Sequence, residues 1–266
     1  MRVVAIHEDA LVVTSRLWQT NAVLLRGARA EGDPEAMLVD SPYFPDELDA
    51  LPAVARQAGF VVEALLATHA DFDHLLGRLA FPQFALGVAE TTAERLRAAA
   101  GAVQRELREA DGEHYVRRAR PLGLGAVQEL PVPGHLEIGD QDLELYPTGG
   151  HTADGMAILA PHVEVLVCGD YLSDVEIPSL GTGGSLDGYR STLARLAPLI
   201  ERSERTVPGH GSPLERVRAL QVLDEDVDYL DALERGEQRP ALPSGRDSGR
   251  QREIHAENLA HLGGER

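Results

Sequence analysis

Short runs of aliphatic and β-branched residues fill the first forty positions of the chain, separated by polar or Gly- and Asp-containing connections. The runs are RVVAI, ALVVT, NAVLLRG and AMLVD. Apolar runs of about four to eight residues bounded by turn residues are typical of β-strands. This pattern predicts an antiparallel sheet at the start of the chain.

A change of period follows. The segment PDELDALPAVARQAG at 45–59 carries apolar residues at helical spacing and ends on Gly, which predicts a helix. VVEALLAT is again a β-rich apolar run, and it ends just before His69. We therefore expect His69 to lie at the C-terminal end of this strand.

The middle of the chain is richer in charge. LLGRLAF predicts a short helix and FALGVA a strand, and residues 91–120 form one long Ala-, Arg- and Glu-rich stretch that predicts a helical insertion at about 90–120. Its basic end, with Arg117, Arg118 and Arg120, is either a solvated face or part of a lid over a site.

Short strands return from Leu130. LEIGDQDLELYPT resembles a hairpin, MAILA and VEVLVCGD are strands, LDGYRSTLARLAPLI is amphipathic, and ERTVPGHG is a short strand that runs into a turn. PLERVRALQVLDEDVDYLDALERG predicts a helix with Pro near its start. The second half of the chain thus shows the same pattern as the first, in which short strands are followed by a helix.

The end of the chain completes the domain organisation. We expect one domain over 1–236, and then a linker, RPALPSGRDSGR, and a last helix, EIHAENLAHL, packing on the same domain over 237–266. The tail offers Arg246, Arg250, Arg252 and His255, which are either solvated or available to an anionic ligand.

Composition narrows the possible partners. A chain of 266 residues with 43% apolar residues can bury one large core. Its formal charge of −18 disfavours nucleic acid and anionic membranes as partners. The single Cys168, the start MRVVAIHEDA without features of a secretion signal, and the lack of a long apolar run predict a soluble, cytoplasmic protein.

Metal-competent side chains occur at four strand tips or turns: THADFDH, GGHT, CGDY and PGHG. Any one of them alone is compatible with a hydrogen-bonded turn or a helix cap. Together they predict a metal site, and the crowding of four such residues within 69–74 suits more than one ion. Imidazole and carboxylate ligands fit zinc, iron or manganese, and the shortage of cysteine excludes a thiolate-rich zinc site.

In these motifs the chain resembles the metallo-β-lactamase fold superfamily. The signature HxHxDH appears as H-A-D-F-D-H, followed by GGHT, GD and PGHG, with further likeness in NAVLL and LVDSP. The resemblance spans roughly residues 10–215 and implies an α+β fold, an αββα sandwich of two mixed sheets face to face with helices outside. It is specific for fold and metal and weak for substrate.

The resemblance also implies roles for the motif residues. Two divalent metal ions, with zinc expected, would be bound by His69, Asp71 and His151 at the first position and by Asp73, His74 and His210 at the second, with Asp170 as the bridge. Asp71 departs from the family pattern, which has His there. A carboxylate hardens the first position and favours iron or manganese, or else weakens it.

The implied activity is that of a metallo-hydrolase, as in glyoxalase II and lactonases: a metal-bridging hydroxide attacks an ester, thioester, lactone or amide-type bond of a small molecule. Asp73 is the expected catalytic group that orients the water and passes a proton on, and Tyr171, with Ser173, is a candidate to stabilise the oxyanion. An iron-dependent oxidoreductase, either di-iron or a mononuclear dioxygenase, is the alternative, and a non-catalytic binding protein is a third hypothesis. A homodimer is compatible with this fold, and the oligomeric state is left open.

Overall fold

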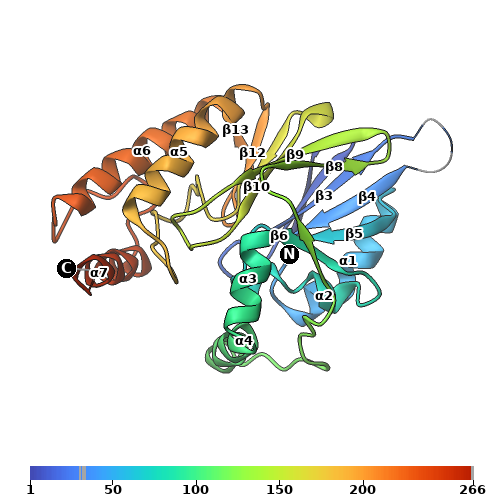
Figure 1. Cartoon of the computed structure of the whole chain (residues 1–266), viewed down its shortest axis with the longest axis horizontal. Coiled ribbons are helices and arrows are strands. Elements are labelled where there is room, and N and C mark those ends of the chain that lie inside the picture. Colours follow the sequence, from blue (N-terminus) through green and yellow to red (C-terminus); the bar gives the residue numbers. More distant parts are fainter. Residues whose placement is uncertain (30, 32–33, 265–266) are drawn as a thin grey trace.

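The structure is a computed structural model of the whole chain, and it describes residues 1–29, 31 and 34–264. Two mixed β-sheets lie face to face, and helices cover their outer faces (Figure 1). This is the four-layered α+β sandwich that the motifs imply.

The first sheet contains seven strands in the order β1-β2-β3-β4-β5-β6-β7. They are β1 (Arg2–His7), β2 (Ala10–Thr14), β3 (Asn21–Gly27), β4 (Glu35–Val39), β5 (Val62–Leu66), β6 (Leu86–Ala89) and β7 (Val127–Leu130). The first four are antiparallel, as predicted, whereas β4 to β7 run parallel to one another.

The second sheet contains six strands in the order β13-β12-β11-β10-β9-β8. They are β8 (Gly134–Ile138), β9 (Gln141–Pro147), β10 (Met156–Ala160), β11 (Val165–Val167), β12 (Arg205–Val207) and β13 (Leu214–Glu215). The expected hairpin of β8 and β9 is antiparallel.

The helices form the two outer layers. They are α1 (Pro45–Gln57), α2 (Gly77–Ala80), α3 (Glu90–Ala98), α4 (Ala102–Glu113), α5 (Leu186–Glu201), α6 (Arg216–Glu234) and α7 (Gly249–Gly264), with short 3₁₀ turns η1 (Phe72–His74) and η2 (Pro161–Val163). Within the described part of the chain, no helix is long and apolar enough to cross a membrane.

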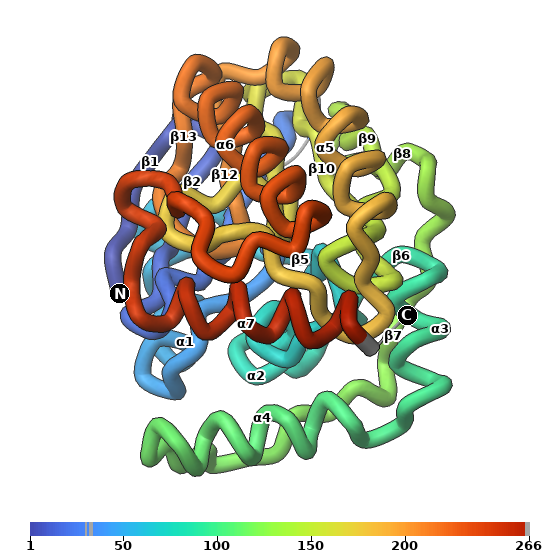
Figure 2. The backbone as a smooth tube through the Cα atoms, turned by 90° about the vertical axis from the view of Figure 1, so that its left-hand side faces the viewer, coloured from blue at the N-terminus to red at the C-terminus, as the bar shows by residue number. Residues whose placement is uncertain are grey.

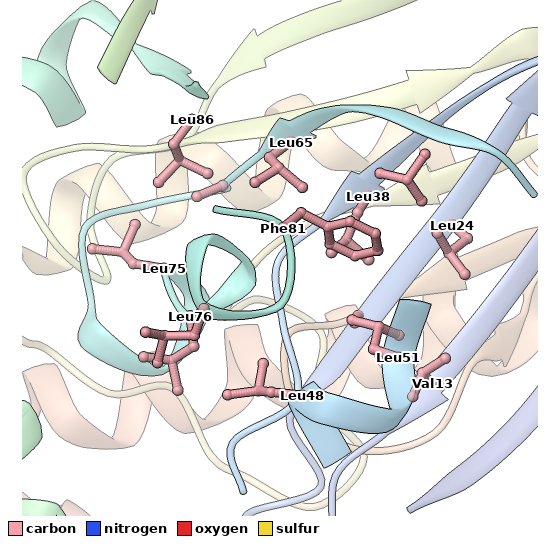
Figure 3. Close-up of a cluster of buried hydrophobic side chains, with 14 of the residues drawn as sticks. Val13, Leu24, Leu38, Leu48, Leu51, Leu65, Leu75, Leu76, Phe81 and Leu86 are labelled. Atoms are coloured by element: carbon pink, nitrogen blue, oxygen red, sulfur yellow. The ribbon is translucent and has the colours of Figure 1, made fainter. Parts of the chain in front are cut away.

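Three buried apolar clusters join the four layers. One lies between the first sheet and α1 to α4, and Figure 3 shows part of it, with Leu24 and Leu38 of the sheet facing Leu51 of α1. The second lies between the two sheets, and the third joins the second sheet to α5, α6 and α7. Burial on both faces explains why the central strands are continuous apolar runs.

The direction of the strands brings the motif loops together. Strands β4 and β5 are parallel, β11 and β12 are parallel, and β9 has the direction of β11 because each is antiparallel to β10. The loops after β5, β9, β11 and β12 carry the four motifs, and they meet at one edge of the sandwich, as the contacts below show.

The insertion differs from the predicted single helical stretch. Gly101, with φ of 80°, ends the continuity between α3 and α4, and the helix stops at Glu113, two residues before Tyr115 with φ of 54°. Two arginines that follow have partners within the protein. Arg118 pairs with Asp111 of α4 at 2.8 Å and donates to the carbonyl oxygen of Tyr43 at 3.0 Å, and Arg120 donates to the carbonyl oxygen of Leu79. Arg118 and Arg120 are therefore not simply solvated, and a lid function of the insertion stays a prediction.

The tail also differs from a solvated linker. The side chain of Arg246 is fully buried and forms ion pairs with Asp226 and Glu225. His255 is buried as well, with its ring nitrogens 3.1 Å from the Tyr229 hydroxyl and 2.8 Å from the Glu237 carbonyl oxygen. Figure 2 shows the last helix, α7, running crosswise below α5 and α6.

Candidate metal centre

Seven ligand groups from four loops gather into two adjacent sets. The first set consists of His69, Asp71, His151 and Asp170, and the second of Asp73, His74 and His210, and within each set the ligand atoms lie within 4.8 Å of one another. All seven residues that the sequence predicts as metal ligands are therefore brought together.

Asp170 lies between the two sets. Its Oδ2 atom is 3.3 Å from Nε2 of His151 and 3.4 Å from Nε2 of His210, and its Oδ1 atom is 3.1 Å from Nε2 of His74. One carboxylate thus reaches histidines of both sets, which is the position of a bridging ligand.

Asp71 points into the first set although it replaces the usual histidine. Its Oδ2 atom lies 3.3 Å from Nε2 of His151 and 3.5 Å from Nε2 of His69. Ligand atoms about 2.0–2.2 Å from one tetrahedral ion are separated by roughly 3.3–3.6 Å. The side chain of Asp71 therefore has the placement of a ligand.

Unpartnered polar atoms show that this arrangement fits a metal. Among the described residues, the buried Nε2 atom of His69 makes no hydrogen bond, and neither do Nε2 of His74 and Oδ1 of Asp170, which lie 3.1 Å apart without hydrogen-bond geometry. Leaving such atoms unpaired is costly in a protein interior. Zinc, iron and manganese are bound by converging imidazole and carboxylate ligands, and the side chains here have these types and this arrangement.

The electrostatics of the cluster point the same way. Burial disfavours the charged imidazoles, but contact with Asp71 and the charge of Asp170 raise the pKa of His151 to about 9. Against the same effect of burial, Asp170 and Glu176 raise the pKa of His210 to about 10. Burial disfavours the Asp170 carboxylate too, yet His210, His74 and His69 hold its pKa well below the usual range. In the metal-free protein, protons on His151 and His210 thus balance the charge of the carboxylates, as bound cations would in the metal-loaded protein.

Each histidine is oriented by a bond to its second ring nitrogen. Nδ1 of His74 lies 3.0 Å from Oδ2 of Asp40, Nδ1 of His69 lies 3.0 Å from Oγ1 of Thr68, and Nδ1 of His151 lies 2.8 Å from the carbonyl oxygen of Ser179. Such partners fix the ring and the tautomer of a metal-ligating histidine.

The remaining histidine is held by the N-terminal part of the chain. Nδ1 of His210 is 3.1 Å from the carbonyl oxygen of Trp18, and the side-chain amide of Asn21 donates to the carbonyl oxygens on both sides of the turn, those of Pro208 and Gly211. The likeness in NAVLL therefore has a structural reason, because Asn21 shapes the turn that presents His210.

Glycine permits the close approach of the loops at two points. A Cβ atom on Gly209 would lie 2.1 Å from Oδ1 of Asp170, and one on Gly150, where φ is 122°, would lie 2.0 Å from the backbone nitrogen of Tyr189. A side chain at either position would displace a ligand loop.

Tyr171 and Ser173 support ligand loops. The backbone N–H of His151 donates to the Tyr171 hydroxyl at 2.9 Å, and the Ser173 hydroxyl donates to the carbonyl oxygen of His210 at 2.8 Å. Burial raises the pKa of Tyr171, so its hydroxyl stays protonated. A role of Tyr171 at an oxyanion stays a prediction.

Four further residues were not singled out from the sequence: Asp40, Arg95, Asp154 and Glu176. Asp40 lies in LVDSP, and Asp154 lies three residues after His151, so proximity to a motif could have pointed to them. Arg95 belongs to the insertion and Glu176 to a loop, and only the fold brings them to the centre.

Comparisons with known proteins agree with this site. The metallo-beta-lactamase superfamily profile matches residues 15–210, which is most of the chain and includes all seven ligands. The chain belongs to the metallo-beta-lactamase superfamily. Members of this superfamily are mostly metal-dependent hydrolases and typically bind two metal ions. No curated protein matches the chain.

Solved structures share the superfamily fold. A metallo-beta-lactamase family protein from Thermus thermophilus is 20% identical, with a TM-score of 0.68 over 97% of this chain and 93% of that one. A metallo-beta-lactamase from Pontibacter korlensis is 21% identical, with a TM-score of 0.59 over 84% and 98%. A double mutant of the sec-alkyl sulfatase PisA1 is 16% identical, with a TM-score of 0.71 over 98% of this chain and 50% of that one. At these identities the likeness concerns the fold.

Proposed function

We propose that this member of the superfamily is a two-metal hydrolase that cleaves an ester, thioester, lactone or amide-type bond of a small molecule. The observation that carries the proposal is the convergence of two ligand sets, in which three buried ligand atoms make no hydrogen bond. Two bound divalent ions, with zinc expected, would polarise the substrate oxygen and bring the pKa of a water molecule toward neutrality.

Asp73 is the group that we expect to orient the attacking water and to pass its proton to the leaving group. Its Oδ2 atom lies 3.4 Å from Nε2 of His210 and 3.7 Å from Nε2 of His74, and the side chain is 9% exposed. The Ser41 hydroxyl donates to the backbone carbonyl of Asp73 at 3.0 Å, which holds the backbone that carries the carboxylate. A general base of this kind has to be held within hydrogen-bond reach of its proton.

Glu176 supplies a further carboxyl group beside the ligands. Its backbone is held on both sides, because its N–H donates to Oγ of Ser173 at 3.0 Å and its carbonyl oxygen accepts from Arg246 at 3.2 Å. Burial raises the pKa of its carboxyl group, and His210, Asp170 and Asp73 act on that group electrostatically. Within the described residues the carboxyl group has no hydrogen bond or ion pair, so we assign it to contact with substrate.

The charge pattern supports an uncharged or cationic small molecule over a polyanion. The chain carries −18, and the tail arginines proposed for an anionic ligand are paired within the protein: Arg250 contacts Glu257 at 3.1 Å and Arg252 contacts Asp247. With Arg246 buried, the tail offers only these two exposed, paired arginines to the anionic peptide of an acylglutathione.

An iron-dependent oxidoreductase is the second candidate, and Asp71 is the observation that favours it. Its carboxylate makes the first set richer in oxygen than the usual histidine would, and oxygen donors suit iron and manganese. A coloured iron protein that is inactive toward esters would support this alternative, and a colourless zinc protein with hydrolase activity would exclude it.

The hydrolase proposal is tested with a panel of small esters, thioesters and lactones. Protein reconstituted with zinc, iron or manganese should hydrolyse at least one member, and His151→Ala or Asp73→Ala should abolish that activity. Two outcomes would contradict the proposal: turnover that survives both substitutions, or a metal-loaded protein that hydrolyses no member of the panel.

A further inference from the structure

Arg95 contacts two carboxylates at the first ligand set. It lies on α3, and its Nη2 atom donates to Oδ1 of Asp71 at 2.6 Å, while its Nη1 atom donates to Oδ1 of Asp154 at 2.7 Å. The guanidinium is 17% exposed. A charge-assisted pair with this geometry and little solvent contact fixes the orientation of both partners.

The two oxygens of Asp71 consequently have separate partners. Oδ1 accepts from Arg95, and Oδ2 lies 3.3 Å from Nε2 of His151 and 3.5 Å from Nε2 of His69. Arg95 thus leaves one oxygen for an ion and keeps the other away from it.

Asp154 connects Arg95 to two ligand loops of the first set, those that carry His69 and His151. Its side chain is 1% exposed, and its Oδ2 atom accepts from the backbone N–H of Ala70 at 2.9 Å, between the two ligands His69 and Asp71. Since Asp154 follows His151 in the same turn, one guanidinium joins two of the three loops that supply the first set.

The ion pair of Arg95 and Asp71 also affects the net charge of the centre. The superfamily pattern has a neutral histidine where this chain has Asp71, so the substitution adds one negative charge to the centre. The guanidinium beside Asp71 adds one positive charge, and at this distance in a poorly solvated site the two largely cancel.

We propose that Arg95 is a positioning residue for the first metal ion, and that Asp71 and Arg95 together replace the single histidine of the superfamily pattern. The inference rests on the two-metal site of the proposed function. Arg95 holds Asp71 as a ligand through one oxygen and offsets its charge, while Asp71 contacts the ion.

The test is a double-mutant cycle read by metal binding. Metal-free wild type, Arg95→Gln, Asp71→His and the double variant are titrated with Zn²⁺ against a chromophoric chelator, which gives an affinity for each of the two equivalents. Arg97→Gln is the matched control, because Arg97 lies on the same helix and pairs with Glu129 at the surface.

Loss of a group that orients a ligand commonly weakens metal binding about 10- to 100-fold. We expect Arg95→Gln to weaken one equivalent by this factor and to leave the other within about threefold. In the Asp71→His background the same substitution should change neither equivalent by more than about threefold, and Arg97→Gln should have no effect in either.

The outcomes separate the two proposals. Wild type that binds no Zn²⁺ would contradict the two-metal function itself. Wild type that binds two equivalents, with Arg95→Gln equally good at binding both, or equally impaired with and without Asp71→His, would overturn the role of Arg95. Should Arg95→Gln fail to fold, Arg95→Lys, which keeps the charge and loses the fork, must still weaken the same single equivalent; unchanged binding in that variant would also overturn the role.

Discussion

Oδ2 of Asp40 lies 3.0 Å from Nδ1 of His74 and accepts from the Thr68 hydroxyl at 2.9 Å. Oδ1 of Asp40 accepts from the backbone N–H of Thr68 at 2.8 Å. The buried carboxylate of Asp40 therefore orients the ring of the ligand His74 and holds Thr68, the residue before the ligand His69. The backbone of Asp40 has a φ of 57°.

Asp40→Asn tests this relationship. The amide keeps the size of the carboxylate but loses the charge that orients His74, so one equivalent of Zn²⁺ should bind about 10- to 100-fold more weakly. The chelator competition described above measures the change. Unaltered affinity for both equivalents would show that Asp40 only builds the loop.

Metal binding should release protons at neutral pH. The carboxylates around His151 and His210 raise their pKa values to about 9 and about 10 in the metal-free protein, so both rings are protonated at pH 7.5 and must lose a proton to bind a cation. Apparent affinity should accordingly fall as the pH is lowered. Calorimetric titration in buffers of different ionisation enthalpy counts the protons. Release of none would mean that these histidines are neutral before metal binds.

Glu176→Gln should separate activity from stability. A half-buried carboxyl group without a partner is costly to charge, so removing its charge should leave the free energy of unfolding unchanged or raise it. Turnover should fall about tenfold or more if the group contacts substrate. Urea unfolding and kcat/KM measure the two effects. A loss of stability without a loss of turnover would show that the side chain is structural.

Arg246→Met should destabilise the fold. Arg246 is buried and bound to Asp226, so removing the guanidinium leaves a buried carboxylate unpaired, at a cost of about 3–5 kcal/mol in the free energy of unfolding. Arg250→Met is the matched control: Arg250 forms exposed pairs with Glu253 and Glu257, and its loss should cost less than about 1 kcal/mol. Equal effects of the two substitutions in urea unfolding would place Arg246 in a solvated tail.

Local patterns predicted the strands and the metal ligands because each signal is contained in a few neighbouring residues. The apolar runs before His69 and Asp170 form β5 and β11, and the histidines in glycine turns come to the same edge of the sandwich. The resemblance to the superfamily then assigned ligands to two sets, which the strand directions explain.

The rest depended on contacts between distant segments. Arg95 reaches Asp71 only because α3 folds back beside β6, and Arg246 becomes buried only because the tail covers α6. A charged helix and a Pro- and Gly-containing segment have the same composition whether they are solvated or packed. The sequence therefore left the surroundings of their arginines open, and the structure shows Arg118 and Arg246 in ion pairs.

The most direct measurement is the metal content of the purified protein after reconstitution, compared between wild type and Asp170→Ala. Asp170 reaches both ligand sets, so wild type should hold two ions per chain and the variant should retain fewer than two. Wild type that holds no ion after reconstitution, or a variant that keeps both ions with undiminished affinity, would contradict a two-metal centre bridged by Asp170.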